Sequence, residues 1–406
     1  MTALKSIEES SLRYAGWRVV VACFLVELFV FGFGLYGHGV YLAELQRLHG
    51  WSTTLISTAS TLSFLLGSLL GVFTGDVMAR LGPQRVVLLG LSALAASTTL
   101  LAFVATPWQL FAAYILMSFG WAGMGTVAVA TILSSWFDRR RGLAISLAFN
   151  GATFGGMIVA PALVLLAAEV GFARAMLAAT AAMVAILLPT VAGLISLPVS
   201  ANGDTTRNSS TPQVEATPQG RSRWQLLGSF GFWTISAPFA LALLAQVGFI
   251  VHQIALLEPA MGRSLAGFAV ALTTTTAVIG RVCLGLVVDR VDPRLVTAAS
   301  LVTQAAALFA ITQTADTNGL FLACAAYGFS IGNLVTLPPL IIQREYEQAA
   351  FGIVLGLSTA VWGVVSAFGP GLLGLVRGAT GGYAAALFLC LALKLVSAAI
   401  VLLRPR

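Results

Sequence analysis

The sequence predicts an all-α membrane protein with twelve transmembrane helices in two related six-helix bundles. The first supporting observation is composition: 58% of the 406 residues are hydrophobic and only 9% are charged. About 25% of the residues in an average soluble domain are charged, and a soluble protein with this balance would expose large apolar patches and aggregate. The composition therefore excludes soluble enzymes, nucleic-acid-binding proteins and disordered chains.

The second observation is a regular series of apolar segments, each close to the roughly 20 residues that a spanning helix needs. They are expected at 17–43, 53–79, 84–105, 107–136, 142–168, 173–197, 228–257, 264–289, 294–314, 318–343, 350–376 and 381–403. A segment rich in Ser, Thr, Pro, Asn and Gly divides them six and six and is typical of a flexible linker. We predict an N-terminal bundle over 1–197, a cytoplasmic linker over 198–227 and a C-terminal bundle over 228–406.

The third observation is an internal repeat. Arg80 and Arg290 follow similar sequences after the second and eighth segments and are 210 residues apart, and Gly142 and Gly352 have the same separation. Paired six-helix halves are typical of secondary transporters, whose site lies near the bilayer midplane between the halves.

The basic residues indicate the orientation of the predicted bundle. The formal net charge is +7, from 22 Lys and Arg against 15 Asp and Glu. Most of the basic residues fall at the two termini, in the linker and in alternate loops, which the positive-inside rule assigns to the cytoplasm. We therefore expect a multi-pass protein of the cell inner or plasma membrane with both termini cytoplasmic and no nucleic-acid partner.

Motifs for enzymatic chemistry are missing from the sequence. The four cysteines lie in apolar segments without metal-ligand spacing, and we find no phosphate-binding loop and no plausible Ser-His-Asp set. We expect a protein that is not an enzyme, binds no metal or cofactor, and uses a proton gradient as its driving force.

Several motifs resemble those of known families. The turn Gly285–Arg290 is similar to the cytoplasmic loop signature of the major facilitator superfamily. The sequences Tyr14–Trp17, His49–Ser52 and Ser135–Ile145 resemble the monocarboxylate transporter and oxalate–formate antiporter families. The resemblance implies the major facilitator fold and transport by alternating access.

The resemblance also implies a cytoplasmic gate made by loop charges. In the first half Ala79 stands where the family has an acid, although Asp76 could pair with Arg80 at i,i+4. The alternative role of the basic run 139–141 is topology and contact with lipid headgroups. The predicted gating residues are Asp76, Arg80, Asp138, Arg139, Asp289 and Arg290.

An arginine within the eighth segment is the leading candidate for substrate binding. Charge inside a membrane is costly, and monocarboxylate transporters carry an arginine where this chain has Arg281. A guanidinium can bind a carboxylate through two parallel hydrogen bonds. Relatives often have an aspartate one turn earlier, where this chain has Ala277. The alternative is a structural ion pair or a side chain that reaches the membrane surface.

Glu27 and His38 in the first segment are the candidates for proton coupling. They are eleven residues apart, which places them within about 20° of the same face of an uninterrupted α-helix. A histidine titrates near neutral pH, and a buried carboxyl can also carry a proton. The alternative is a packing role for each.

The remaining candidates come from the helices that line the pathway in the resembling superfamily. Interhelical packing is the alternative for each aromatic residue. The substrate-binding candidates besides Arg281 are Tyr327, Asn333, Tyr114, Phe119 and Trp362, and further polar or aromatic candidates are Trp121, Asn150, Gln246, His252, Ser330 and Ser358. For Lys394 in the last segment we expect pairing within the bundle or a side chain that reaches the surface.

The expected function is proton-coupled symport of a small monocarboxylate such as lactate or pyruvate. Alternatives are an organic-anion exchanger for oxalate and formate and a drug–proton antiporter; a non-transporting membrane sensor is disfavoured because we find no soluble signalling domain. The expected partners are a small organic anion, a proton and the lipid bilayer, and we expect a monomer.

Overall fold

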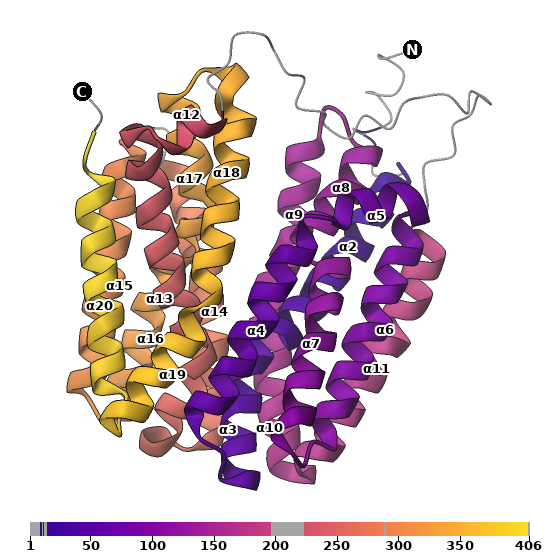
Figure 1. Cartoon of the computed structure of the whole chain (residues 1–406), viewed down its shortest axis with the longest axis vertical. Coiled ribbons are helices and arrows are strands. Elements are labelled where there is room, and N and C mark those ends of the chain that lie inside the picture. Colours follow the sequence, from indigo (N-terminus) through magenta and orange to yellow (C-terminus); the bar gives the residue numbers. More distant parts are fainter. Residues whose placement is uncertain (1–8, 10, 12–13, 196–222, 288–289, 405–406) are drawn as a thin grey trace. The chain divides into compact units, whose positions relative to one another are not determined.

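The computed structural model describes residues 9, 11, 14–195, 223–287 and 290–404, and no strand occurs in these ranges. The elements of the first half are α2 (Gly16–Phe31), the π-helical turn η1 (Gly32–Tyr36), α3 (Gly37–His49), α4 (Thr53–Gly71), α5 (Thr74–Leu81), α6 (Pro83–Ala102), α7 (Pro107–Met124), α8 (Thr126–Trp136), α9 (Arg141–Phe154), the π-helical turn η2 (Gly155–Val159), α10 (Ala160–Val170) and α11 (Phe172–Leu194). Figure 1 shows most of them with these labels.

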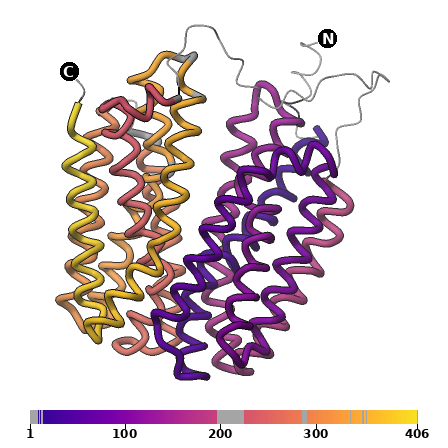
Figure 2. Tube along the Cα trace, viewed as in Figure 1, coloured from indigo at the N-terminus to yellow at the C-terminus, as the bar shows by residue number. Residues whose placement is uncertain are grey.

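The second half begins with a short helix inside the predicted linker, most of which (198–222) lies outside the described residues. Its elements are α12 (Arg223–Leu227), α13 (Phe230–Met261), α14 (Arg263–Val287), α15 (Pro293–Gln313), α16 (Thr317–Ile331), α17 (Asn333–Glu345), α18 (Gln348–Ala367), α19 (Gly369–Thr380) and α20 (Ala384–Val401). In this half α13 packs between α18 and α20, and α15 packs against α20 (Figures 1 and 2).

All twelve predicted spans are confirmed: twelve helical stretches in the described ranges are long and apolar enough to cross a membrane. The largest differences are at the second span, which ends at Gly71 and not at 79, and at the first, which continues to His49. Large apolar side chains such as Leu322 (74% exposed) and Trp108 (69% exposed) lie on helix surfaces, which is expected where helices face lipid.

Several spans are interrupted, which apolar length alone does not predict. The first and fifth contain η1 and η2, while the fourth, tenth and eleventh are divided into α7–α8, α16–α17 and α18–α19. Glycine is frequent at these points: Gly125 separates α7 from α8, and Gly332 separates α16 from α17. Such breaks are tolerated in a membrane only where other groups satisfy the freed backbone, and π-turns are frequent at functional sites.

The contacts divide the chain into two compact units. Unit 1 contains Met1–His38 and Leu66–Thr211, and unit 2 contains Gly39–Leu65 and Pro212–Arg406. The end of the first span and most of the second span therefore pack with helices of the C-terminal half. The predicted bundle boundaries stay a prediction.

Each unit has the same close crossing of two helices at glycine. In unit 1, a Cβ on Gly155 would lie 2.7 Å from the backbone nitrogen of Gly32 and against the carbonyl of Leu28. In unit 2, a Cβ on Gly369 would lie 2.8 Å from the backbone nitrogen of Gly248 and against the carbonyl of Leu244. In both units the contacted carbonyl and nitrogen are four residues apart, so the internal repeat extends to backbone packing.

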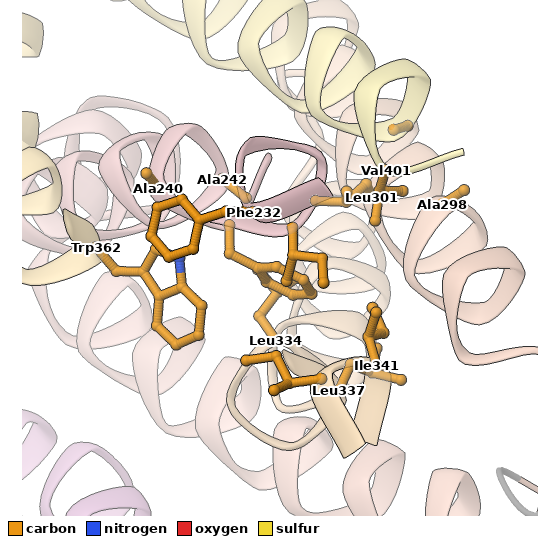
Figure 3. Close-up of a cluster of buried hydrophobic side chains, with 14 of the residues drawn as sticks. Phe232, Ala240, Ala242, Ala298, Leu301, Leu334, Leu337, Ile341, Trp362 and Val401 are labelled. Carbon is orange, nitrogen blue, oxygen red and sulfur yellow. The ribbon is translucent and has the colours of Figure 1, made fainter. Parts of the chain in front are cut away.

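Apolar packing stabilises unit 2 beside its polar sites. Buried side chains from α13, α15, α17, α18 and α20 form one cluster (Figure 3). Its labelled members are Phe232, Ala240, Ala242, Ala298, Leu301, Leu334, Leu337, Ile341, Trp362 and Val401.

Candidate functional site

Arg281 lies on α14 where this helix crosses α16 at very short range. A Cβ on Gly280 would overlap the carbonyl of Phe329, and a Cβ on Gly332 would overlap the carbonyl of Ala277. Small residues permit this approach. Although Arg281 is only one turn before the end of the span Arg263–Leu284, its Nε donates a long hydrogen bond of 3.4 Å to the carbonyl of Gly332. Its partly exposed guanidinium group therefore reaches the middle of the tenth span.

Asn333 and Tyr327 lie on either side of the same break in the tenth span. The Nδ2 of Asn333 donates to Oγ of Ser300 at 3.2 Å, while its Oδ1 has no hydrogen-bond partner within the described ranges. Tyr327 is fully buried, with its ring 4.5 Å from that of Phe249 and its hydroxyl unpartnered among the same residues. The structure thus brings three predicted substrate-binding residues to one break between helices.

Glu27 is fully buried on α2, where this helix packs against α9. A Cβ on Gly151 would lie 3.0 Å from Cβ of Glu27. Neither carboxylate oxygen of Glu27 has a hydrogen-bond partner within the part of the chain that the structure describes. Its carboxyl group is therefore not committed to an ion pair there, which is what a proton-carrying group requires.

His38 is also fully buried, and its ring meets that of Tyr114 edge-on with centroids 5.0 Å apart. His38, a predicted proton-coupling residue, is therefore in ring contact with Tyr114, a predicted substrate-binding residue. The structure does not support the shared helix face of Glu27 and His38, because η1 lies between them and a π-turn holds more residues than an α-turn.

Two predicted aromatic residues of α7 have different surroundings. Trp121 packs against Phe31, with ring centroids 4.7 Å apart, and lies against Gly34 and Gly67. Phe119 is 51% exposed, so it does not take part in this buried contact. Its role in substrate binding stays a prediction.

Trp362 contributes to the packing of unit 2. Its Nε1 donates to the carbonyl of Ser236 at 3.0 Å, its ring packs against Phe239, and it belongs to the apolar cluster of Figure 3. Ser358, another candidate, is hydrogen-bonded to Ser236 with 2.7 Å between the two hydroxyl oxygens. These contacts account for both residues structurally, and they leave the substrate role of Trp362 a prediction.

The predicted gating charges are mostly exposed. Asp76 and Arg80 lie on α5 without an ion pair between them in the described structure. Asp138, Arg139 and Arg290 are exposed, and Asp289 lies outside the described residues. Their role in a gate stays a prediction.

A buried acid that the sequence did not single out organises the loop before α9. The carboxylate of Glu9, 1% exposed, accepts the backbone N–H groups of Asp138, Arg139 and Arg140 at 3.0–3.1 Å. Tyr14 donates its hydroxyl proton to the carbonyl of Trp136 at 2.5 Å. Two of the motifs that carried the family resemblance are therefore in contact.

A second set of charges, also not predicted, lies in unit 2 between α3 and the turn from α13 to α14. Arg47 pairs with Glu44 at 2.9 Å and also with Glu258, and Arg263 pairs with Glu44. These residues stand at the ends of spans, where charge is common. The local sequence does not indicate these contacts, because Glu258 and Arg263 follow Arg47 by more than 200 residues.

A seam of hydroxyl groups and glycines joins α4 to α19. Thr54 donates to the carbonyl of Gly374 at 3.0 Å, and Thr61 accepts the backbone N–H of Gly371 at 2.8 Å. A Cβ on Gly374 would lie 2.6 Å from Oγ of Ser57. The hydroxyls on α4 therefore require glycines on the facing helix.

His252 stabilises this hydroxyl–glycine seam from α13. Its Nε2 lies 3.0 Å from the carbonyl of Pro370 and 3.2 Å from Oγ of Ser57, and its Nδ1 lies 3.1 Å from the hydroxyl of Tyr383. A carbonyl only accepts, so Nε2 carries the proton and Nδ1 of the neutral ring accepts from Tyr383. Burial raises the pKa of Tyr383 to about 12, partly offset by the Arg377 guanidinium, so this hydroxyl keeps its proton.

Lys394 is paired within the bundle, one of the two expected arrangements. It is fully buried, and its Nζ donates to Oε1 of Gln304 at 2.5 Å and to the carbonyl of Ala242 at 2.8 Å.

Repeated six-helix halves with charged groups inside the spans are the architecture of a secondary transporter. The chain belongs to the Major Facilitator Superfamily, whose family model matches residues 24–370. It is an integral multi-pass membrane protein and a transporter of this superfamily.

Similar curated proteins include monocarboxylate transporters. Monocarboxylate transporter 13 of Rattus norvegicus is 26% identical over 400 residues, which cover 96% of this chain and 89% of the relative. Monocarboxylate transporter 11 of Homo sapiens is 27% identical over 419 residues, covering 96% and 83%. The resemblance to monocarboxylate transporters is thus confirmed.

A solved structure shows the same fold. The crystal structure of a bacterial homologue of the human lysosomal transporter Spinster, in an inward-facing and unoccupied conformation, matches with a TM-score of 0.70. The match covers 97% of this chain and 95% of that chain at 13% identity. The predicted fold class is confirmed.

Proposed function

We propose that the protein is a proton-coupled symporter of a small monocarboxylate such as lactate or pyruvate. It works by alternating access in the cell inner or plasma membrane, as a monomer with cytoplasmic termini. The names of its relatives support the substrate class, and the proton gradient is the driving force. An anion moving with one proton crosses the membrane without net charge, which avoids work against the membrane potential.

The observation that carries this proposal is the position of Arg281. Its guanidinium group is partly exposed and lies beside the break in the tenth span, where its Nε donates to the carbonyl of Gly332, the residue before Asn333. A cation there attracts a carboxylate strongly because a partly dry site screens charge poorly. Asn333 retains an unpartnered Oδ1 within the described residues and can accept a hydrogen bond from a substrate hydroxyl.

Glu27 and His38 are the proposed proton-coupling groups. Both lie in unit 1 on the first span, separated by the π-turn η1. In the proposed cycle a proton binds to one of them, and the anion then binds at Arg281. The neutral pair is carried across before either ligand leaves.

The hydroxyl–glycine seam between α4 and α19 and the charges around Arg47 are the proposed gate on the non-cytoplasmic side. Single hydroxyl hydrogen bonds and partly exposed ion pairs are individually weak. Contacts of this strength can form and break in each cycle, as a gate requires.

One observation favours a drug–proton antiporter as the second candidate. Glu27 lies one helical turn before Phe31, which packs against Trp121. An acid near an aromatic pair suits an organic cation. Efflux of a cationic dye without uptake of organic acids would select this candidate.

The test of the site is uptake of labelled organic acids into proteoliposomes by Arg281 variants. We expect Arg281→Ala to abolish uptake and Arg281→Lys to retain part of it, because lysine keeps the charge without the planar fork. Arg174→Ala is the matched control, since Arg174 is exposed at the start of α11. Wild-type uptake by Arg281→Ala would contradict the proposal.

A further inference from the structure

Lys394 is a buried cation that the proposed transport cycle does not use. It lies on α20, is fully buried, and is 5.8 Å from the centre of the Tyr327 ring. Its hydrogen-bond partners are a carbonyl and a side-chain amide, and no carboxylate of the described chain pairs with it. A buried charge without a counter-ion is costly, so simple packing is a poor reason for a lysine at this position.

The lysine determines the orientation of the Gln304 amide. Its Nζ donates to Oε1 of Gln304, so the amide oxygen faces the lysine. The amide NH2 group then points the other way, where Nε2 donates to the carbonyl of Ser330 at 3.2 Å. Lys394 therefore acts on α16 through Gln304, although it does not itself bond to that carbonyl.

Ser330 lies at the end of α16, where the break in the tenth span begins. The last carbonyls of a helix lack partners within it, and an unsatisfied carbonyl inside a membrane is costly. Gln304 satisfies the carbonyl of Ser330, and Arg281 contacts that of Gly332. Ser300, one turn before Gln304 on α15, accepts from Asn333 at the start of α17. The break is thus held by α15 on one side and by Arg281 of α14 on the other.

We propose that Lys394 and Gln304 are positioning residues for anion binding. Together they hold the α16–α17 break, and with it the carbonyl that fixes the side chain of Arg281. This inference rests on the proposed role of Arg281 in binding the substrate. It gives a buried lysine remote from the substrate an effect on substrate affinity.

The test compares Gln304→Leu, Lys394→Met and the double variant for thermal midpoint and for the KM of uptake. Gln304→Leu leaves the buried Nζ of Lys394 with one oxygen partner fewer, so the thermal midpoint of this variant should fall. The double variant removes both polar groups, which restores much of the stability. If Lys394 and Gln304 position the break, KM stays raised by about tenfold in the double variant. If the two residues serve only in packing, KM of the double variant returns to the wild-type value and the proposal is overturned.

Hydrogen–deuterium exchange provides a readout that does not depend on the substrate. We expect the amides of 333–336 to exchange faster in the double variant than in wild type, while those of 90–97 in α6 of unit 1 are unchanged. Equal exchange at 333–336 would overturn the proposal. If wild-type protein takes up no monocarboxylate, the proposed function fails, and the exchange experiment alone decides this inference.

Two further variants guard against misfolding and nonspecific effects. Gln304→Glu keeps an oxygen partner for Lys394 but cannot donate to Ser330 when ionised, so its thermal midpoint should fall less than that of Gln304→Leu while exchange at 333–336 is still faster. Thr98→Val with Thr180→Val removes a buried hydroxyl pair in unit 1. This control should leave KM and the exchange at 333–336 unchanged.

Discussion

Gln84 and Arg294, 210 residues apart, each donate hydrogen bonds to the final carbonyls of the last helix in their own half. Gln84 contacts the carbonyl of Ala192 at 2.8 Å and that of Val191 at 3.4 Å. Arg294 contacts the carbonyl of Val401, itself 210 residues after Val191, at 2.5 Å. The internal repeat therefore preserves a helix-capping contact although the residue type differs.

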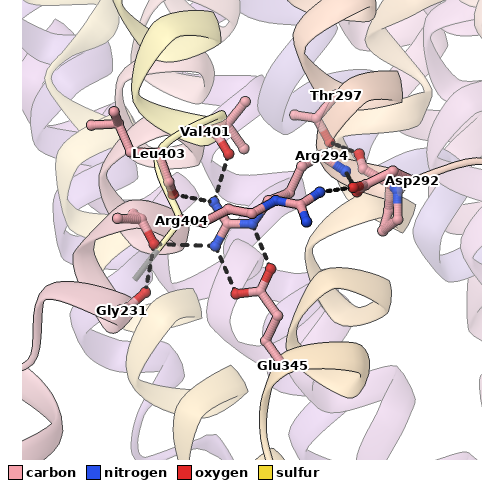
Figure 4. Close-up of polar contacts among 10 residues, drawn as sticks. Gly231, Asp292, Arg294, Thr297, Glu345, Val401, Leu403 and Arg404 are labelled. Carbon is pink, nitrogen blue, oxygen red and sulfur yellow. Dashed lines mark hydrogen bonds and ion pairs between the residues drawn. The ribbon is translucent and has the colours of Figure 1, made fainter. Parts of the chain in front are cut away.

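The two capping residues should differ in their contribution to stability. Arg294 is 1% exposed and forms two hydrogen bonds with the carboxylate of Glu345, at 2.5 and 2.7 Å (Figure 4). Arg294→Met leaves that acid without its buried partner and should cost about 3 kcal/mol. Gln84→Met should cost about 1 kcal/mol. Thermal unfolding in detergent checks this, and equal losses would contradict the assignment.

The crossing of α14 and α16 should tolerate no added methyl group. A Cβ on Gly280 would overlap the carbonyl of Phe329, so Gly280→Ala should destabilise the protein by about 1–3 kcal/mol. Gly356 on α18 has open space around its Cβ position. As the control, Gly356→Ala should be stabilising by about 0.5–1 kcal/mol. A stable Gly280→Ala protein with unchanged uptake would argue against the close crossing.

Cross-linking the hydroxyl–glycine seam should stop transport. A Cβ on Gly378 would lie 3.9 Å from that of Thr54, near the usual separation of about 3.8 Å in disulfides. We expect Thr54→Cys with Gly378→Cys, in a Cys283→Ala background, to lose uptake on oxidation and recover it on reduction. Cys283 is removed because it is exposed, whereas the other three cysteines are buried.

The control for this cross-link replaces Thr58, which is exposed one turn further along α4. Thr58→Cys with Gly378→Cys should remain active under the same oxidation. A formed Thr54–Gly378 cross-link that leaves uptake intact would show that the seam does not open during transport.

Proton coupling should depend on Glu27, on His38 or on both. We expect Glu27→Gln or His38→Ala to lose uphill, pH-driven uptake while keeping exchange of labelled for unlabelled substrate, because exchange moves no net proton. Uptake and exchange measured in the same vesicles separate the two effects. If both variants still accumulate substrate, the coupling assignment is wrong.

The sequence was sufficient for the spans because apolar length and charge placement follow directly from the membrane environment. It was not sufficient for the interruptions, since η1 and the α16–α17 break depend on contacts with other helices. The prediction for Glu27 and His38 illustrates this: it holds for an uninterrupted α-helix, and η1 between them changes their angular relation.

The candidate site could be predicted in part. Arg281, Asn333 and Tyr327 were singled out as polar groups deep in spans, and the structure brings them to one break. Glu9 and the charges around Arg47 were missed because such residues at the ends of spans are common. Their partners lie up to about 200 residues away in the sequence, and nothing in the local sequence indicates those contacts.

The central claim is coupled movement of a proton and a monocarboxylate. Its most direct test is uptake of labelled lactate or pyruvate into proteoliposomes with an imposed pH gradient, alkaline inside. The account predicts accumulation above the external concentration, lost on adding a protonophore and absent in Arg281→Ala vesicles. Uptake that proceeds equally with and without the gradient would contradict it.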